Sequence, residues 1–313
     1  MRAGENPTLD LRVRFTVEPE SAGSRLDKLV GARLGLGRRR TAELFQQGAV
    51  RTGARPAKKG DLGQAGDIID VAPGAPDHAV AEPEIPLAVR HVTAQVLVVS
   101  KPAGQPTAPL RGGEHGTLAG ALLGRYPELA GFGHSALEPG LVHRLDTGTS
   151  GLVLVGRTRR AFERLSAALS AGAIEKRYLA IVGAAALTSE SGQVDLPLAP
   201  HPGDPRRVAW ATSGGLRGAR AASTRFHVRA RHGTWALLEV EAPRAYRHQV
   251  RAHLASLGLP LAGDALYGGP PAPELGTRHA LHASYVAWTG DAEIAGFAVR
   301  DDLPRDMSVL LDG

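Results

Sequence analysis

The segment that most constrains this chain is a polar turn between two apolar runs at residues 141–155, which read LVHRLDTGTSGLVLV. Short apolar runs of this kind are consistent with buried strands. Gly148 and Gly151 permit the tight backbone that a turn between strands requires. Asp146 is the one carboxylate in the segment, and the turn would present it from a rigid platform, as suits a reactive group. An Asp that merely caps the turn is the alternative.

Length and composition narrow the class of protein. The 313 residues suffice for roughly one to three domains, and 43% hydrophobic residues can fill a substantial core. The formal charge of +6 and the pI of about 10.0 favour a polyanionic partner, although an ordinary basic enzyme can have the same balance. The absence of cysteine excludes disulfides and Cys-ligated zinc, and it fits a cytoplasmic protein. The chain opens with no long apolar run, so neither a signal peptide nor a membrane partner is expected.

The first part of the chain predicts a small unit of helices and strands. Residues 1–14 are expected to be a flexible terminus. Within residues 15–71, the apolar spacing predicts two short helices, the second opening with Arg38, Arg39 and Arg40, followed by two strands. Three adjacent guanidiniums can neutralise several phosphates and release counterions. Because cations at a helix N-terminus oppose the macrodipole, their cluster favours a functional role over a solvated helix end.

A linker rich in Pro and Ala is predicted at residues 72–87, and residues 88–313 form a larger domain. In that domain, residues 157–171 predict an amphipathic helix, and residues 175–183 predict a strand. Tyr178 lies on one face of that strand. Taken alone, it is better explained as a core aromatic residue than as a functional one.

A further helix is predicted over residues 244–258, with an apolar stripe that ends at Leu257. Arg251 lies about a quarter turn from the centre of this stripe, which places it at the edge of the core. His248 and His253 are five positions apart and point away from each other, which argues against a metal site. The chain contains neither a dinucleotide fingerprint nor a Walker loop, so no cofactor is expected.

Residues 143–151 read HRLDTGTSG, and the string H-R-L-D-x-x-T-S-G resembles the signature of the RluA-type pseudouridine synthases, which contains their catalytic aspartate. Other segments resemble further motifs of that family. They are VSKPAG at 99–104, KRYLAIV at 176–182, RAYRHQVR at 244–251, LPLAGDALYG at 259–268 and RHALHA at 278–283. The last two segments are expected to be mainly scaffold.

Two segments depart from the family pattern. Where the family often has V-H-P, residues 107–109 read TAP. Residues 244–247 read RAYR in place of the usual T-G-R-T, so that Tyr246 stands where the family has an Arg. The second half of this motif matches, and the assignment of Arg251 rests on it. The unit at residues 15–71 separately resembles the alpha-L RNA-binding fold first known from a small-subunit ribosomal protein.

The resemblance implies an α+β protein, in which a small alpha-L domain precedes a catalytic domain built on a large mixed, mainly antiparallel sheet. It implies that the chain is a monomer that isomerises uridines to pseudouridine in structured RNA. Ribosomal RNA is the expected partner, and transfer RNA is the alternative. The reaction breaks the N1 glycosidic bond, turns the base and rejoins the sugar through C5, without a redox change or a metal.

The resemblance also implies roles for individual residues. Asp146 is the essential catalyst, either as a nucleophile at C1′ or as a base at C2′, and Arg251 is the cation that favours its ionised form. Tyr178 would stack under the target base and assist proton removal at C5. Arg144 would fill the space left by a base that leaves its stack. Further RNA contacts are expected from Lys101, His143, Arg247 and His248, together with Arg38, Arg39 and Arg40.

Two other functions remain open at this stage. One is a non-catalytic RNA-binding protein that keeps the synthase fold, which the altered motif at residues 244–247 suggests. The other is a dimeric aspartic protease, because Asp146 opens the tetrapeptide D-T-G-T. Protease chemistry needs two such carboxylates that share a proton, and the chain has no second D-T-G or D-S-G.

Overall fold

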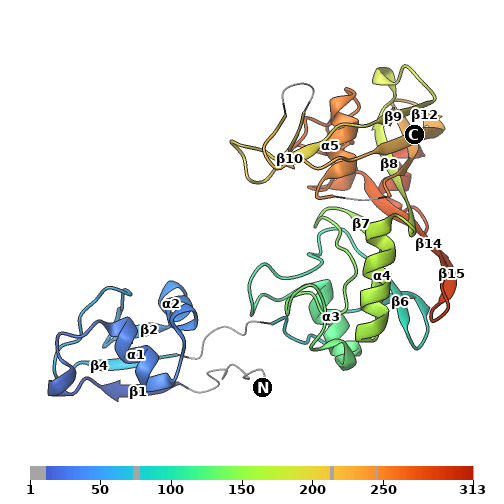
Figure 1. Cartoon of the computed structure of the whole chain (residues 1–313). Helices are drawn as coiled ribbons and strands as arrows, with labels where there is room; N and C mark the ends of the chain where they lie inside the picture. Colours follow the sequence, from blue (N-terminus) through green and yellow to red (C-terminus); the bar gives the residue numbers. More distant parts are fainter. Residues whose placement is uncertain (1–11, 73–77, 212–214, 244–245, 313) are drawn as a thin grey trace. The chain divides into compact units, whose positions relative to one another are not determined.

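The computed structural model divides into two compact units, Met1–Asp77 and His78–Gly313, each with its own core (Figure 1). The described residues are 12–72, 78–211, 215–243 and 246–312. Arg244 and the neighbouring Ala245 therefore lie outside the described residues. No helix within these ranges is long and apolar enough to cross a membrane.

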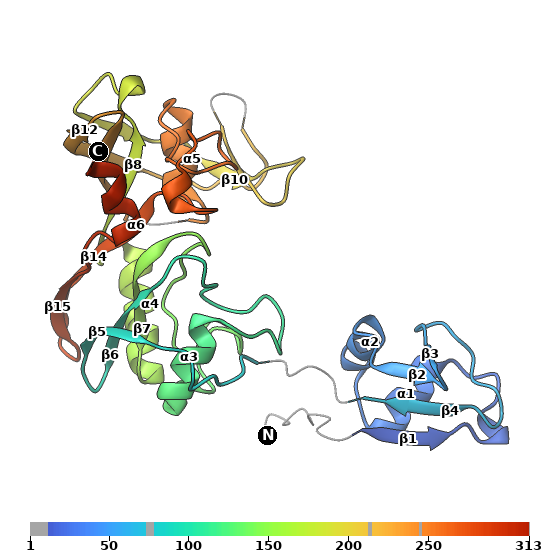
Figure 2. The ribbon, with the colours of Figure 1, turned by 180° about the vertical axis from the view of Figure 1, so that it is seen from behind.

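The first unit packs two helices against a four-stranded antiparallel sheet with the order β1-β4-β2-β3 (Figure 2). Its elements are β1 (Val13–Thr16), α1 (Leu26–Leu34), α2 (Arg38–Gln46), β2 (Val50–Thr52), β3 (Arg55–Pro56) and β4 (Ile68–Val71). Leu26 and Val30 of α1 are buried together with Leu44 of α2 and Ile69 of β4. The predicted pairs of helices and strands are present, and burial of these apolar residues holds them together.

The expected flexible terminus at residues 1–14 extends too far. Val13 pairs with Val71, and the Arg12 guanidinium donates to the Asp70 carboxylate at 2.6 Å. These contacts attach the chain to strand β4 from residue 12 onward, so β1 begins before the predicted boundary. The assignment of this unit to the alpha-L fold stays a prediction.

The expected linker at residues 72–87 also extends too far. Ala79 and Glu82 are buried in the second unit. The Glu82 carboxylate accepts the Gly116 N–H at 2.9 Å, and the Glu82 N–H donates to the Gly120 carbonyl at 2.9 Å. A buried carboxylate needs such partners, so this segment is anchored to the second unit, which begins at His78 rather than at residue 88.

The second unit is built on a nine-stranded sheet with the order β5-β6-β7-β14-β8-β13-β12-β9, and β15 pairs with β14. Its strands are β5 (Ala88–Val92), β6 (Val96–Lys101), β7 (Ser150–Gly156), β8 (Glu175–Gly183), β9 (Ser191–Val194), β12 (Thr224–His232), β13 (Trp235–Glu241), β14 (Leu281–Gly290) and β15 (Ala295–Arg300). A separate pair is formed by β10 (Leu198–Pro200) and β11 (Val208–Trp210). Strands β7 and β14 are parallel and the other neighbours are antiparallel, which confirms the predicted mixed, mainly antiparallel sheet.

Helices cover both faces of this sheet. Leu97 of β6 belongs to the core that contains α3 (Leu118–Arg125), whereas Val98 belongs to the core that contains α4 (Arg159–Ala171). This alternation follows from the two-residue period of a strand, and it explains why β6 is apolar at every position from residue 96 to 99. The short helix α6 (Arg305–Ser308) and a 3-10 turn (Val309–Leu311) follow β15.

Helix α5 (Gln249–Ser256) is shorter than the predicted helix at residues 244–258. His248 just before it has φ 55° and ψ 14°, and this left-handed conformation cannot continue a right-handed helix. Val250 and Leu254 of α5 share their core with Tyr178 of β8. The helix therefore lies against the sheet face on which Tyr178 projects.

Candidate active site

Asp146 lies in a turn directly before strand β7. The Thr149 N–H donates to the Asp146 carbonyl at 3.0 Å and closes the turn. Of the two apolar runs predicted to be strands, only the second forms one. Leu141 of the first run makes a single bridge with Val155, because the following residues leave the sheet toward the site. The Asp146 side chain is 23% exposed, so its carboxylate can be reached from solvent.

Gly151 sets the distance between the Asp146 turn and strand β14. Its φ is 111°, and a Cβ at this position would lie 2.3 Å from the Ala283 carbonyl oxygen. A side chain is therefore excluded where β7 and β14 begin their parallel pairing. This glycine fixes the turn close to the middle of the sheet.

Lys101 supports the turn from inside the protein. Its ammonium group donates to the carbonyls of Pro102 and Gln105 at 2.8 Å each and to that of Thr147 at 3.3 Å. The residue is 0% exposed, and burial lowers its pKa to about 7. The loop after β6 covers the Lys101 side chain, and backbone carbonyls accept its hydrogen bonds. The expected RNA contact of Lys101 is therefore wrong.

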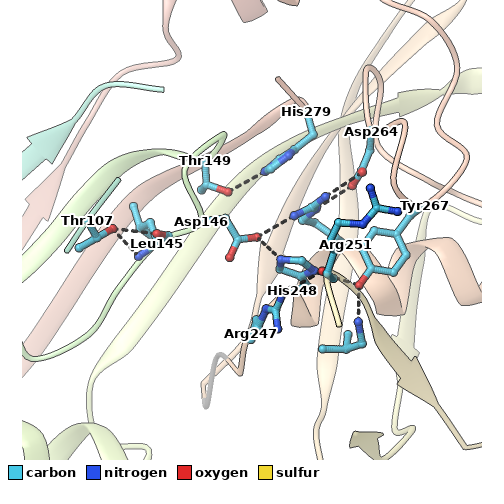
Figure 3. A network of polar contacts seen from close by, with 12 residues as sticks. Thr107, Leu145, Asp146, Thr149, Arg247, His248, Arg251, Asp264, Tyr267 and His279 are labelled. Carbon is cyan, nitrogen blue, oxygen red and sulfur yellow. Dashed lines mark hydrogen bonds and ion pairs between the residues drawn. The ribbon is translucent and has the colours of Figure 1, made fainter. Parts of the chain in front are cut away.

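Arg251 joins Asp146 to a second carboxylate (Figure 3). Its Nη1 donates to Asp146 Oδ2 at 3.0 Å, whereas Nε and Nη2 donate to the two oxygens of Asp264 at 2.7 and 2.9 Å. The guanidinium lies 5.2 Å from the centre of the Tyr267 ring, and the Arg251 side chain is 8% exposed. The structure thus brings together Asp146 and Arg251, as the sequence predicts. Asp264 holds the other side of the guanidinium.

His248 lies on the same side of the carboxylate as Arg251 (Figure 3). Its Nδ1 is 3.0 Å from the Tyr267 hydroxyl, and its Nε2 is 3.7 Å from Asp146 Oδ2. Burial lowers the pKa of His248 to about 4. The ring is therefore neutral at pH 7.

Tyr178 is buried, with 4% of its surface exposed, and belongs to the main core of the second unit. Burial raises the pKa of its hydroxyl, and the negative charge of Asp146 raises it further. The phenol is therefore protonated over the physiological range. In this environment it can contact a base or donate a hydrogen bond, but it is a poor proton acceptor.

The expected RNA contacts near Asp146 fall into two groups. His143 is partly buried and accepts the Leu154 N–H at 3.2 Å, and burial together with the charge of Lys176 lowers its pKa to about 3. Its Nε2 is used to support β7, so this nitrogen does not make the expected RNA contact. Arg144 and Arg247, by contrast, are exposed.

The two exposed arginines have protein partners. Arg144 donates to Glu138 at 2.7 Å, and Arg247 donates to the Arg206 carbonyl at 2.8 Å. A polar cavity of about 470 Å³ adjoins Arg251, and its lining includes Arg206 and Asp264. The loop that carries Arg206 therefore borders the site.

The arginine cluster of the first unit is only partly exposed. The Arg39 side chain is 96% exposed and Arg38 is also exposed, but Arg40 is 13% exposed. Both Arg39 and Arg40 pair with Glu43, at 3.2 and 3.3 Å. Arg40 turns toward Glu43 of its own helix and is poorly placed for the expected phosphate contact. The phosphate contacts of Arg38 and Arg39 stay a prediction.

Asp264 and Tyr267 also belong to the site, although their segment was predicted to be mainly scaffold. Their only signal was a pair of polar residues in an otherwise apolar stretch, LPLAGDALYG. Their function depends on contacts with Arg251 and His248, which no spacing within that stretch reveals. Within the described ranges, no group of three or more His, Asp or Glu side chains is arranged to hold a metal ion.

Comparison with known proteins places this geometry in a family. Residues 95–256 match the RNA pseudouridylate synthase family. Ribosomal large subunit pseudouridine synthase D from Xanthomonas campestris pv. campestris is 34% identical over 96% of this chain and 94% of its own length. An uncharacterized RNA pseudouridine synthase from Chloroflexus aurantiacus is 35% identical over 98% of this chain and 96% of its own length.

Solved structures agree at the level of the fold. Human RNA Pseudouridylate Synthase Domain Containing 4 superposes with a TM-score of 0.54 at 22% identity, covering 71% of this chain and 90% of that chain. This chain belongs to the RNA pseudouridylate synthase family, and its enzyme class is that of the isomerases. The comparisons give no support to the interpretation of D-T-G-T as a protease turn.

Proposed function

We propose that this chain converts specific uridines of structured ribosomal RNA to pseudouridine, with Asp146 as the essential catalyst. The name of the Xanthomonas relative supports the large ribosomal subunit as the source of the substrate. The observation that carries the proposal is the Asp146 carboxylate, which is reachable from solvent and bound by the buried guanidinium of Arg251 at 3.0 Å.

The two oxygens of Asp146 have different surroundings. Oδ2 accepts the hydrogen bond from Arg251, and no hydrogen bond within the described residues reaches Oδ1. An ionised Oδ1 could attack C1′ of the target nucleotide or remove a proton from C2′, and both roles remain open. Either role needs a negative oxygen.

The neutral phenol of Tyr178 suits contact with the base. Its buried ring can lie against a uracil, and the hydroxyl can donate a hydrogen bond to it. Because burial raises its pKa, we assign Tyr178 to holding the base while it turns, rather than to accepting the C5 proton.

A uridine in folded RNA must leave its stack to reach Asp146. Arg144 is exposed two positions before the catalytic residue, and its guanidinium could exchange Glu138 for the space that the base vacates. Arg38 and Arg39 of the first unit would add contacts with RNA phosphates.

The proposal is tested by the isosteric variant Asp146→Asn. Ribosomal and transfer RNA from cells with the wild-type gene, with no gene and with the variant are mapped for pseudouridine. We expect one or more sites in large-subunit RNA to disappear in both altered strains. The purified variant should retain the wild-type Kd for RNA and the wild-type Tm, which separates a chemical defect from a folding defect.

A matched control is Asp302→Asn, which makes the same chemical change at an exposed carboxylate of the same unit. It should restore modification fully. Unchanged modification in the Asp146→Asn strain would refute the catalytic role. RNA binding without a product on any cellular RNA from the wild-type protein would favour the non-catalytic alternative.

A further inference from the structure

His248 combines an unusual backbone with a buried position beside Asp146. It is the one non-glycine residue with a positive φ among the residues that the structure describes. A left-handed conformation is unfavourable for any residue with a Cβ, although His tolerates it better than most. Such a conformation persists where the surrounding contacts require it, and these contacts indicate what the residue does.

The Tyr267 hydroxyl is placed to set which nitrogen of His248 carries the proton. That hydroxyl accepts the N–H of Val208 at 2.9 Å and lies 3.0 Å from His248 Nδ1. Because a hydroxyl has a single proton and already accepts from Val208, it can donate that proton to Nδ1. In the neutral ring the remaining proton then resides on Nε2.

His248 Nε2 faces the Asp146 carboxylate. It lies 3.7 Å from Asp146 Oδ2, the oxygen that also accepts from Arg251 (Figure 3). The opposite tautomer would direct a lone pair at a negative oxygen, which is unfavourable. A shift of about 0.8 Å would turn the present contact into a hydrogen bond, and contacts in catalytic sites often tighten by such amounts when substrate binds.

We propose that His248 is a positioning residue for Asp146: its Nε2–H, fixed by Tyr267, holds Oδ2 together with Arg251 so that Oδ1 faces the substrate. The inference rests on the proposed function of Asp146 and extends it to a residue expected only to contact RNA. Two donors on one oxygen restrict rotation of the carboxylate, which Arg251 alone would not.

The ring acts as a neutral donor in this arrangement. Asp146 and Asp264 favour its imidazolium form, whereas Arg251 and Arg247 oppose it. Burial has the largest effect and keeps the ring neutral at pH 7. A neutral ring does not compete with Arg251 as a counter-ion of Asp146. His248 would therefore orient the carboxylate without adding a charge.

Two variants separate positioning from a structural role. In His248→Gln, the amide nitrogen can replace Nε2–H, but the link to Tyr267 is broken. In His248→Asn, the shorter side chain can keep the link to Tyr267 and tolerates the left-handed backbone, but it cannot reach Asp146. Single-turnover rates are measured on the modified RNA with the full-length enzyme in excess, together with the Kd for RNA and the Tm.

We expect His248→Asn to lower the single-turnover rate by about 10- to 100-fold, which corresponds to removal of one hydrogen bond to a charged group. His248→Gln should retain a rate at least about 5-fold above that of His248→Asn, although its Tm should be the lower of the two. Equal rates, or a faster Asn variant, would overturn the proposal. The control His253→Gln changes a fully buried histidine of α5, the helix that follows His248, and should lower Tm without altering the rate.

The protonation of the ring is measured independently of activity. Nitrogen-15 NMR of the full chain at pH 7 distinguishes the two neutral tautomers of histidine. We expect the Nε2–H form for His248 and the disappearance of this preference in Tyr267→Phe. The Nδ1–H form in the wild-type protein would refute the proposal even if Asp146 proves essential.

Discussion

The Thr107 hydroxyl forms two hydrogen bonds with the backbone of Leu145, the residue before Asp146. It donates to the Leu145 carbonyl at 2.7 Å and accepts the Leu145 N–H at 3.1 Å. Thr107 is 4% exposed, so both bonds are shielded from water. This side chain stands where the family often has a valine, and here it ties the loop after β6 to the Asp146 turn.

We expect the isosteric variant Thr107→Val to destabilise the second unit by about 1–3 kcal/mol, because it leaves a buried N–H and a buried carbonyl without partners. It should also lower kcat, since the backbone of Asp146 is no longer held in place. The free energy of unfolding is measured by urea denaturation, and kcat is measured on the modified RNA.

Thr117→Val serves as the matched control. Thr117 is also buried, and its side chain caps α3 by accepting the Gly120 N–H at 3.0 Å. Removal of this cap should cost about 1 kcal/mol of stability without changing kcat. If the two variants lowered kcat equally, the effect would reflect general destabilisation, and the positioning role of Thr107 would be rejected.

Arg251 is expected to tolerate no replacement, not even lysine. The guanidinium donates to Asp146 and to both oxygens of Asp264 at once, which a single ammonium group cannot reproduce. Arg251→Lys should lower kcat by about 100-fold or more, the typical effect of removing one fixed donor at a developing charge. The change is measured under single-turnover conditions with saturating enzyme.

The control for this prediction is Arg160→Lys. Arg160 pairs with Glu293 on the surface, where an ion pair contributes little to stability. It should leave both kcat and Tm within experimental error of the wild type. A fully active Arg251→Lys enzyme would show that the bidentate contact with Asp264 does not position the guanidinium for catalysis.

The elements of the fold were predictable where a local pattern decides them. Strand β8 spans Glu175–Gly183, as the alternation of residues 175–183 predicts. Helix α5 was predicted to begin too early, because His248 has a left-handed backbone conformation and contacts Tyr267 and Asp146. These partners are distant in sequence, and no helical propensity encodes them.

The candidate site was predictable only in part for the same reason. The motif match paired Asp146 with Arg251 across 105 positions, and the structure brings them together. The motif match gave no reason to include Asp264. This residue joins the site only through its hydrogen bonds with Arg251. Lys101 was misplaced because the charge of a lysine suggests an exposed position, whereas three backbone carbonyls compensate its burial here.

Buried histidines make the stability of the second unit dependent on pH. Burial lowers the pKa of His248 and His279 to about 4, compared with 6.5 in an unfolded chain. Between these values the unfolded state binds protons that the folded state does not, so stability is highest above pH 6.5 and falls toward pH 4. Each histidine should contribute a slope of up to about 1.4 kcal/mol per pH unit.

This slope is measured by urea denaturation between about pH 4.5 and 7. The range extends from about two pH units below the ordinary pKa of histidine to just above it. Tryptophan fluorescence reports the second unit, because Trp210, Trp235 and Trp288 all lie in it. We expect His279→Gln to flatten the slope. An equal slope in the wild type and His279→Gln would contradict the burial of a neutral ring at this position.

The exposed arginines of α2 should determine part of the salt dependence of RNA binding. Replacing both residues in Arg38→Gln/Arg39→Gln removes two exposed guanidiniums, so the slope of log K against log salt should fall by roughly 0.7–0.9 for each phosphate that is no longer neutralised. Lys58→Gln/Lys59→Gln removes the same charge from exposed positions of the same unit and should change the slope less. The Kd for RNA is measured at several salt concentrations, with tryptophan fluorescence as a check that the second unit is unchanged. If phosphates bind at α2, the slope must depend on which cations are removed. Equal slopes for the two double variants would therefore assign the effect to net charge and contradict phosphate binding at α2.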